Sequence, residues 1–168
     1  MKSKSVLLPI ILIVFIAFTG CPYESNVPLS DAKYSTIDPD ITGKWIISSS
    51  EIKGYNDTLM IIRFNGHEFY LESHELKKSG PVINRGRAFI TLIGDQKILN
   101  LCDLKEPGKF YFARYTCTGN RMITSHASDQ YIKKEFTSSR ELSDYFKTHI
   151  TSQGFFEPAD TLIRISEK

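Results

Sequence analysis

The dipeptide Asn65-Gly66 constrains the fold of this chain more than any other feature of its sequence. It stands between two runs, residues 59–64 and 68–73, that are rich in apolar and aromatic side chains. Asn-Gly is strongly favoured in two-residue hairpin turns of type I′, because both residues tolerate positive φ angles. The sequence therefore predicts an antiparallel pair of strands around this turn.

A two-residue turn also determines which side chains face each other across the predicted hairpin. The predicted pairs are Phe64 with His67, Ile62 with Phe69, Met60 with Leu71, Arg63 with Glu68, and Ile61 with Tyr70. The first three pairs give an almost wholly apolar face. The Arg–Glu pair lies on the other face and favours this register, because opposite charges stabilise facing strands. We therefore expect Met60, Ile62 and Phe64 to line the interior.

More strand-like runs follow, separated by turn signals at Gly94-Asp95, Pro107-Gly108 and Gly119-Asn120. The predicted strands are residues 44–49, 59–64, 68–73, 87–93, 97–104, 110–117, 122–126, 131–136 and 161–166. A capping box that begins at Ser138 predicts a helix start before the last strand. The helical spacing of Leu142, Tyr145, Phe146 and Ile150 indicates an apolar stripe. The chain is therefore predicted to be mainly β, with one C-terminal helix before the last strand.

The first twenty residues have the layout of a secretory signal peptide. Lys2 and Lys4 give a positive start, and residues 6–18 form an unbroken apolar run. As a helix this run would be about 20 Å long, whereas the hydrocarbon core of a bilayer is roughly 30 Å thick. We therefore expect residues 1–20 to be an export signal rather than a membrane-spanning helix.

The residues Phe18-Thr19-Gly20-Cys21 resemble the lipobox of bacterial lipoproteins, in which an apolar residue, a small residue and Gly or Ala precede a cysteine. The family usually has Leu at the place of Phe18. The resemblance implies that Cys21 receives a thioether-linked diacylglycerol, that cleavage before Cys21 follows, and that the new amino group is acylated. Two or more acyl chains give stable anchoring, whereas one is marginal. The other interpretation is an ordinary signal peptide with a chance cysteine.

The same resemblance implies a place in the cell envelope. An Asp after the cysteine of enterobacteria-like lipoproteins resembles an inner-membrane retention signal, and this chain has Pro22 instead. We therefore expect a lipoprotein of the outer membrane, facing the periplasm, if the cell has such a membrane. The first partner of the chain is then a membrane, bound through the lipid on Cys21.

The charges of the chain do not favour a nucleic-acid partner. The full sequence has 21 Lys and Arg against 19 Asp and Glu, and the loss of Lys2 and Lys4 would leave 19 of each. The longest basic runs are the pairs Lys77-Lys78 and Lys133-Lys134. Such pairs are typical of a solvated surface.

Residues 22–40 are predicted to be a flexible tether. Pro, Ser and Asp are dense there, and no period of two or of 3.6 residues is sustained. A segment of this length reaches at most about 60 Å when extended, or on the order of 25 Å as a coil. The predicted organisation is therefore a signal peptide (1–20), a lipidated cysteine with its tether (21–40) and one domain (41–168).

The tripeptide Gly43-Lys44-Trp45 at the first predicted strand resembles the Gly-x-Trp signature of lipocalins and lipocalin-like domains. The resemblance implies an antiparallel up-and-down barrel of eight strands, with Trp45 closing one end and Arg164 packed over it. The helix before the last strand is similar to that family too. Such a barrel leaves no free edge and just holds side chains or one small ligand. The alternative is that Trp45 is simply a core aromatic residue.

The remaining candidates for chemistry form no recognised catalytic or metal-binding motif. The sequence has no P-loop, Gly-x-Gly-x-x-Gly or Gly-x-Ser-x-Gly motif, so we expect no cofactor and no catalytic residues. The four histidines, His67, His74, His126 and His149, lack a metal-ligand spacing, so we expect no metal.

Cys102 and Cys117 could form a disulfide in an exported protein, where such bonds persist. Pairing about Pro107-Gly108 would place Cys102 opposite Ala113, four residues from Cys117 and too far for a bond. A slipped register or a different strand pairing would join them. The other interpretation is two buried free thiols.

These observations leave three hypotheses about function. The first is a non-enzymatic binding module that holds or transfers a small apolar ligand. The second is a structural lipoprotein that binds envelope proteins through its surface and has a filled barrel. The third is an enzyme whose acid and base residues come together only on folding.

Overall fold

The computed structural model describes residues 21–47 and 56–165. The predicted signal peptide, with Phe18-Thr19-Gly20 of the lipobox, and residues 48–49 of the first predicted strand lie outside this range. The elements, in chain order, are strand β1 (Glu24–Ser25), the 3₁₀ helices η2 (Ala32–Tyr34) and η3 (Pro39–Ile41), strands β2 (Gly43–Ile47), β3 (Asp57–Arg63), β4 (Phe69–Lys77), β5 (Gly80–Ile93), β6 (Gln96–Asp103), β7 (Phe110–Thr118) and β8 (Arg121–His126), helix α1 (Ser139–His149), and strand β9 (Asp160–Arg164).

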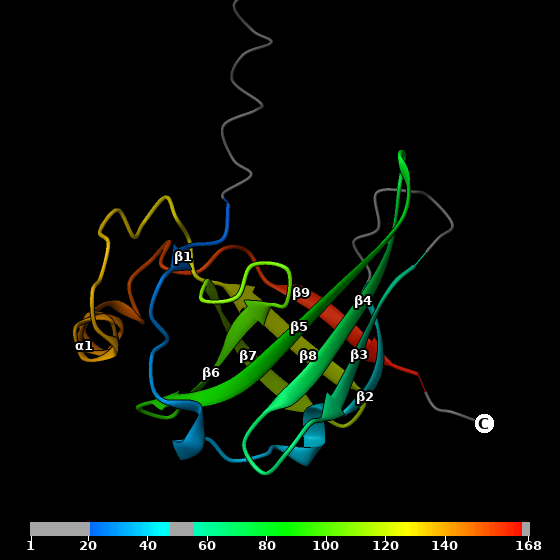
Figure 1. Ribbon diagram of the computed structural model, residues 1–168, viewed down its shortest axis with the longest axis horizontal. Coiled ribbons are helices and arrows are strands. Elements are labelled where there is room, and N and C mark those ends of the chain that lie inside the picture. The colour runs from blue at the N-terminus through cyan, green and yellow to red at the C-terminus, as the bar shows by residue number, and fades with distance from the viewer. Residues whose placement is uncertain (1–20, 48–55, 166–168) are drawn as a thin grey trace, which may run out of the picture.

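Strands β2 to β9 form a closed, antiparallel, up-and-down barrel (Figure 1). Each strand pairs with the next along the chain, and β9 pairs with both β8 and β2, which closes the sheet. The predicted mainly-β fold, with one helix before the last strand, is confirmed. The predicted turns at Gly94 and Gly119 are also confirmed, and both glycines have the positive φ that tight turns need (62° and 59°).

Residues 131–136 are the predicted strand that the structure contradicts. They form an irregular segment between β8 and α1. Their apolar residues are buried all the same, because Ile132 and Phe136 pack against α1 instead of entering the sheet. A short apolar run of this kind does not distinguish a strand from a buried loop.

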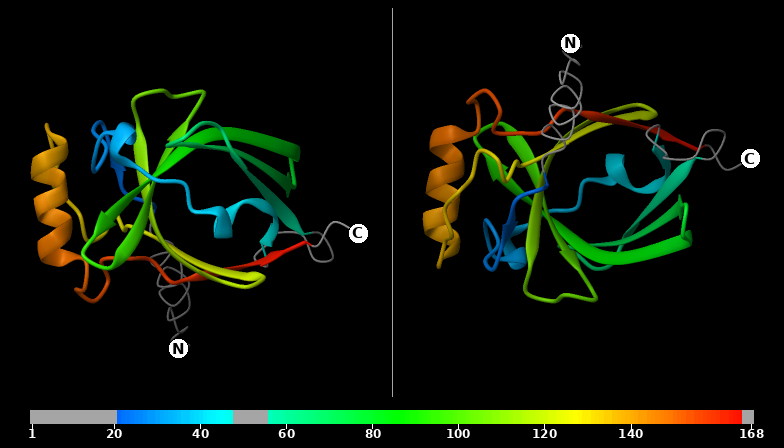
Figure 2. Two further views of the ribbon diagram at one scale, coloured as in Figure 1. Left: turned by 90° about the horizontal axis from the view of Figure 1, so that it is seen from below. Right: turned by 90° about the horizontal axis from the view of Figure 1, so that it is seen from above.

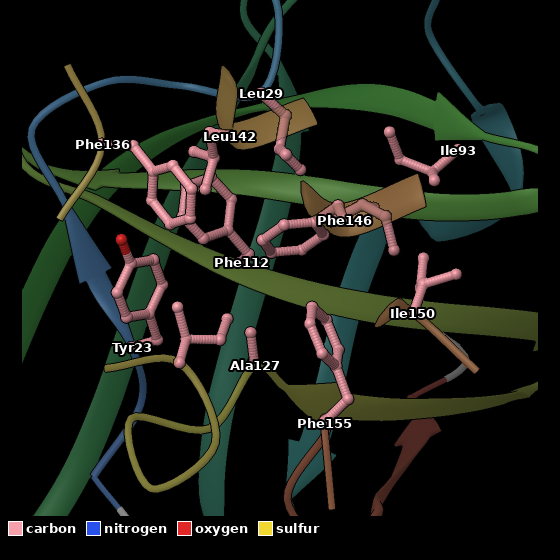
Figure 3. Packing of buried hydrophobic residues seen from close by; sticks show 12 residues of the cluster. Tyr23, Leu29, Ile93, Phe112, Ala127, Phe136, Leu142, Phe146, Ile150 and Phe155 are labelled. Carbon is pink, nitrogen blue, oxygen red and sulfur yellow. The ribbon is translucent and has the colours of Figure 1, made fainter. Parts of the chain in front are cut away.

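Helix α1 packs on the outside of the barrel, as its apolar stripe predicts (Figure 2). Ser138 caps it, and the Ser138 Oγ accepts a hydrogen bond from the backbone N–H of Glu141 at 3.3 Å. Leu142 and Phe146 are fully buried, and the Phe146 ring packs edge to face on Phe112 of β7 and on Phe155 (Figure 3). This outer core joins the helix to the barrel wall.

The hairpin at Asn65-Gly66 forms, but its register differs from the prediction by one residue. The Phe64 N–H donates to the Glu68 carbonyl oxygen at 2.9 Å, so the loop has three residues, not two. Within it, the Asn65 side chain accepts hydrogen bonds from the backbone N–H groups of His67 (2.7 Å) and Glu68 (2.9 Å). Gly66 does not have the positive φ that a type I′ turn requires.

The slip of one residue turns the predicted inner face of β3 outward. Ile61 faces Leu71 and is buried, whereas Ile62 faces Tyr70 and is 49% exposed. The prediction that Met60, Ile62 and Phe64 line the interior is therefore wrong. The predicted inward orientation of Phe69 and Leu71 on β4 is confirmed by their place in the barrel core.

The predicted flexible tether is also wrong, because residues 22–40 pack along the outside of the barrel. Tyr23 and Leu29 are buried in the outer core, and β1 pairs with the start of β7. The Leu29 N–H donates to the side chain of Asn100 at 2.8 Å, and the Ser35 Oγ accepts from the N–H of Ile90 at 2.8 Å. The folded domain therefore begins beside Cys21 and not at residue 41.

The two ends of the barrel differ, and we name them by the residues beside them. At the Trp45 end lie η2, η3 and the turns after β3, β5 and β7. At the Cys21 end lie β1, the β4–β5 turn, the β6–β7 loop and the segment that follows β8 (Figure 1). All later statements about the site refer to these two ends.

Candidate ligand-binding cavity

The Trp45 end of the barrel is filled by protein side chains. Trp45 is fully buried, and its Nε1 donates a hydrogen bond to the Ile41 carbonyl oxygen at 2.9 Å. The Arg164 guanidinium lies over the indole, 4.7 Å from the ring centroid, and donates to the Asp40 carbonyl oxygen. The predicted packing of Arg164 on Trp45 is confirmed.

Gly43 is required by the backbone at this end. Its φ of 125° is an angle that other residues rarely adopt, and an added Cβ would contact the Arg164 side chain at 3.8 Å. Gly43 and Trp45 therefore both stabilise the place where η3, β2 and β9 meet.

A buried polar contact completes the closure of the Trp45 end. The Asp38 carboxylate accepts a hydrogen bond from the Tyr115 hydroxyl at 2.9 Å and pairs with the Lys97 ammonium at 2.6 Å. Burial, together with the neighbouring Asp38, raises the pKa of Tyr115 well above its usual value. Tyr115 thus stays a neutral donor and holds η3 over this end of the barrel.

The Cys21 end of the barrel holds a cavity of about 440 Å³. Its apolar lining comes from Leu59, Leu71 and Leu101 on three different strands, and these leucines pack on the filled core beneath them. The polar lining consists of Ser73, Glu75, Asn84, Arg85, Cys102, Asp103, Tyr111 and His126. Among residues 21–47 and 56–165, the barrel is therefore filled at the Trp45 end and has a cavity at the Cys21 end, with an apolar floor below a polar rim.

The polar rim is partly ordered by hydrogen bonds of its own. The Asn84 side-chain amide donates to the Glu75 carboxylate at 3.0 Å, and the Ser73 hydroxyl donates to the same carboxylate at 3.3 Å. The Tyr111 hydroxyl donates to Glu24 of β1 at 2.7 Å, which raises the pKa of Tyr111 to about 12. These bonds order the rim, whose charged residues are the carboxylates Glu75 and Asp103 and the cationic Arg85.

His126 is the rim residue with an unused hydrogen-bonding atom. It pairs across the β7–β8 ladder with Ala113 of the barrel core, and its Nδ1 is buried without a partner among the described residues. Burial lowers the pKa of His126, against the opposing effect of the Asp160 and Glu157 charges. The lowered pKa favours the neutral imidazole at pH 7, whose buried Nδ1 has no hydrogen-bond partner among the described residues.

The neutral state of His126 predicts a dependence of stability on pH. Below about pH 6.5, the unfolded chain binds a proton that the folded ring resists, so the free energy of unfolding falls as the pH falls. We expect the His126→Gln variant to lose less stability than the parent chain between about pH 7 and about pH 5. Urea denaturation followed by circular dichroism would measure this difference. Parallel pH profiles for the two chains would contradict a buried neutral His126.

Cys21 lies beside the cavity, with an exposed side chain. The backbone N–H of Asp129 donates to the Cys21 carbonyl oxygen at 3.1 Å, and Pro22 belongs to the cavity lining. The predicted lipidation site and the candidate binding site are thus adjacent, which the expected flexible tether did not suggest.

Cys102 and Cys117 are both free thiols. The β6–β7 register sets Cys102 opposite Phe110, three residues from the Ala113 of the prediction. Cys117 is seven residues further along β7, about 23 Å away, and points to the opposite face of the sheet. A disulfide between them is therefore incompatible with this register. The Cys117 thiol instead donates to the Asp40 carbonyl oxygen at 3.1 Å.

Within residues 21–47 and 56–165, no three His, Cys, Asp or Glu side chains gather as a metal site would require. None of the helices that the structure describes has the length and apolar character needed to cross a bilayer. No protein-family model, curated protein or solved structure matches this chain.

The sequence prediction missed the residues of the polar rim. Asn84 and Glu75 lie in the stretch between residues 73 and 87 that was assigned to no strand, although it forms the long β4–β5 hairpin. The signal that could have revealed it is Ser79-Gly80-Pro81, a turn sequence flanked by alternating residues.

Proposed function

We propose that this chain is a lipid-anchored protein of the cell envelope whose barrel binds a small amphiphilic molecule and performs no catalysis. The observation that carries the proposal is the cavity that the described residues form at the Cys21 end of the barrel. A cavity of about 440 Å³ is within the range of roughly 300–1,000 Å³ that small-molecule sites occupy. Its leucine floor would accept the apolar part of a ligand.

The rim suggests the chemistry of the other part of the ligand. Glu75 and Asp103 supply carboxylate oxygens, and Asn84 and His126 supply further polar atoms. Arg85 also belongs to the lining, and Glu75 pairs with Lys77, so a polar head group that both donates and accepts hydrogen bonds matches this set. This refines the expected ligand from a purely apolar molecule to an amphiphile.

The anchor is the second part of the proposal. Its support is the likeness of Phe18-Thr19-Gly20-Cys21 to a lipobox, together with the exposed Cys21 side chain. In an outer membrane the barrel would then face the periplasm. Trp45 closes one end of the barrel, and the cavity lies at the other end. This arrangement agrees with the lipocalin-like architecture that Gly43-Lys44-Trp45 suggests.

The alternative of a protein-binding lipoprotein has one observation in its favour. The outer face formed by β9, β2 and β3 carries exposed apolar residues, among them Ile163 and Ile62. Exposed apolar patches often mark interaction sites. A barrel without bound molecules, combined with a stoichiometric cross-link from this face to an envelope protein, would favour the alternative.

The ligand hypothesis is tested by filling the cavity. Leu101 lies opposite Ala88 and Tyr111 in the barrel wall, so a larger side chain there enters the space that a ligand would occupy. We expect the chain purified from its cells to carry a small amphiphile that native mass spectrometry detects. The Leu101→Trp variant should lose at least about 90% of that molecule, because each 1.4 kcal/mol of lost contact is tenfold in affinity.

The matched control places the same side chain outside the barrel. Ile62→Trp adds an indole on the exposed face of β3 and should leave the bound molecule in place. Both variants should keep the far-ultraviolet circular dichroism of the parent chain. An empty parent barrel, or a full complement of ligand in Leu101→Trp, would refute the binding function.

A further inference from the structure

The position of Cys21 relative to the cavity is fixed by backbone contacts. Its carbonyl oxygen accepts a hydrogen bond from Asp129, and Pro22 bridges to Ser128 directly after β8. Pro22 also lines the cavity. A group attached to the exposed Cys21 Sγ would therefore leave the protein at the rim of the hollow end.

The residues directly after Cys21 are packed on the barrel, so the barrel is not free to rotate relative to Cys21. The Tyr23 N–H donates to the Ala127 carbonyl oxygen at 2.7 Å, and the Tyr23 hydroxyl donates to the Lys134 carbonyl oxygen at 3.1 Å. The Tyr23 ring is buried in the outer core, stacked on Phe112 (Figure 3). These contacts hold the attachment point on the barrel wall, whereas a flexible tether would leave the orientation free.

We infer that the Cys21 end of the barrel faces the bilayer and lies against it, so that the cavity exchanges its ligand directly with the membrane. This inference rests on the proposed lipid anchor. Acyl chains that start at the rim draw the rim to the head groups when they insert. The Trp45 end then points away from the membrane, and the ligand passes between lipid and cavity beside Pro22.

The loops at the Cys21 end carry side chains that suit a membrane surface. The β4–β5 turn presents Lys78, and the β6–β7 loop presents Lys105 and Leu104, which is 47% exposed. The same loop also carries the exposed Glu106, which lies 3.9 Å from Lys109, and Lys109 pairs more closely with Glu24 at 2.6 Å. Lysines beside an apolar side chain favour contact with anionic head groups.

Tryptophan quenching by brominated lipid tests the orientation. The acylated full chain would be bound to vesicles of phosphatidylethanolamine and phosphatidylglycerol whose acyl chains carry bromine. Trp45 is the only native tryptophan and is buried at the far end, so it gives a constant background. Leu104→Trp should be quenched. Leu92→Trp, which is 63% exposed near the Trp45 end, should keep its fluorescence.

A linker variant tests whether the short connection sets the orientation. Inserting a Gly/Ser linker of about ten residues between Cys21 and Pro22 should preserve vesicle binding but weaken the quenching of Leu104→Trp. Equal quenching at positions 104 and 92 without the linker, or unchanged quenching with it, would overturn the inference and leave the anchor intact. Failure of the unaltered chain to sediment with vesicles would overturn the anchor itself, and the inference with it.

Discussion

Replacing Trp45 by alanine is expected to lower the free energy of unfolding by about 3–5 kcal/mol, the cost typical of truncating a large buried aromatic side chain. Trp45 is fully buried at the point where η3, β2 and β9 meet. Its removal would leave a cavity under Arg164 and an unpaired carbonyl oxygen at Ile41, because the indole covers the first and donates to the second.

A second variant separates the loss of the buried ring from the loss of the hydrogen bond to Ile41. Trp45→Phe keeps most of the buried ring and the stacking surface for Arg164 but loses the hydrogen bond to Ile41, so we expect it to cost about 1–2 kcal/mol. Urea denaturation followed by circular dichroism would compare the two variants, since both lack the only tryptophan. A cost below about 1 kcal/mol for Trp45→Ala would contradict the role of Trp45 in closing the barrel.

The fold was predictable because most of its turns are encoded locally. Gly94 and Gly119 supply positive φ angles at two tight turns, and the alternation of side chains between them is that of strands. The spacing of Leu142 and Phe146, with Ser138 as the cap, predicts the helix and its buried face. Each of these signals depends only on residues that are close in sequence, so it can be recognised without knowledge of the tertiary structure.

The inner face of β3 was not predictable from the same kind of signal. Asn65 can form a type I′ turn with Gly66, or it can accept the N–H groups of His67 and Glu68 with its side chain. The two choices differ by one residue in loop length and therefore exchange the faces of β3. The His67 ring Nδ1 also forms a hydrogen bond with the Ser35 carbonyl oxygen at 2.8 Å. This contact joins residues far apart in the sequence, so a local sequence pattern cannot predict it.

The N-terminal segment was misjudged for a related reason. Its Ser and Asp residues are typical of linkers, yet they cap short helices and satisfy buried backbone groups here. Asp31 and Asp38 each accept a backbone N–H at the start of a 3₁₀ helix, and Pro39 occupies the first position of η3. Asp-Pro is a helix-start signal as well as a linker signal, and the buried partners Tyr23 and Leu29 decide between the two.

The cavity depends on the register of β3 and on the packing of the N-terminal segment, and so could not be predicted from the sequence. Its floor depends on which of Leu59 and Met60 faces inward, and the predicted register reversed them. Its proximity to Cys21 depends on the packing of Pro22 and Tyr23. The sequence predicted a barrel that could hold a ligand, and the structure locates the space at one end.

Cys21→Ser is expected to release the chain from membranes almost completely. A buried CH₂ group contributes about 0.8 kcal/mol to membrane binding, so the acyl chains of a diacylglycerol dominate the attachment. Serine offers no thiol for the thioether bond. Because the Cys21 side chain is exposed and the contact with Asp129 uses the backbone carbonyl, the change should alter the free energy of unfolding by less than about 0.5 kcal/mol.

The matched control is Cys117→Ser, because Cys117 is a half-buried thiol on β7 that no lipid is expected to modify. Because cleavage is expected to follow lipidation, the Cys21→Ser chain is given an ordinary signal peptide that is removed without lipidation. Cell fractionation should then find Cys117→Ser with the membranes and Cys21→Ser in the soluble fraction. Persistent membrane association of Cys21→Ser would refute the anchor, since the thioether would then not be the attachment. Release of both variants would instead point to misfolding, which their circular dichroism would reveal.

The released Cys21→Ser chain also separates anchoring from binding. Its cavity is lined by Pro22 and by barrel side chains, none of which the substitution changes. If ligand enters from solution, the soluble chain should carry as much amphiphile as the anchored one. If ligand enters from the bilayer, the soluble chain should carry much less and should regain it on exposure to vesicles that contain the molecule. The second result is expected, because the rim beside Cys21 is where lipid and cavity would meet.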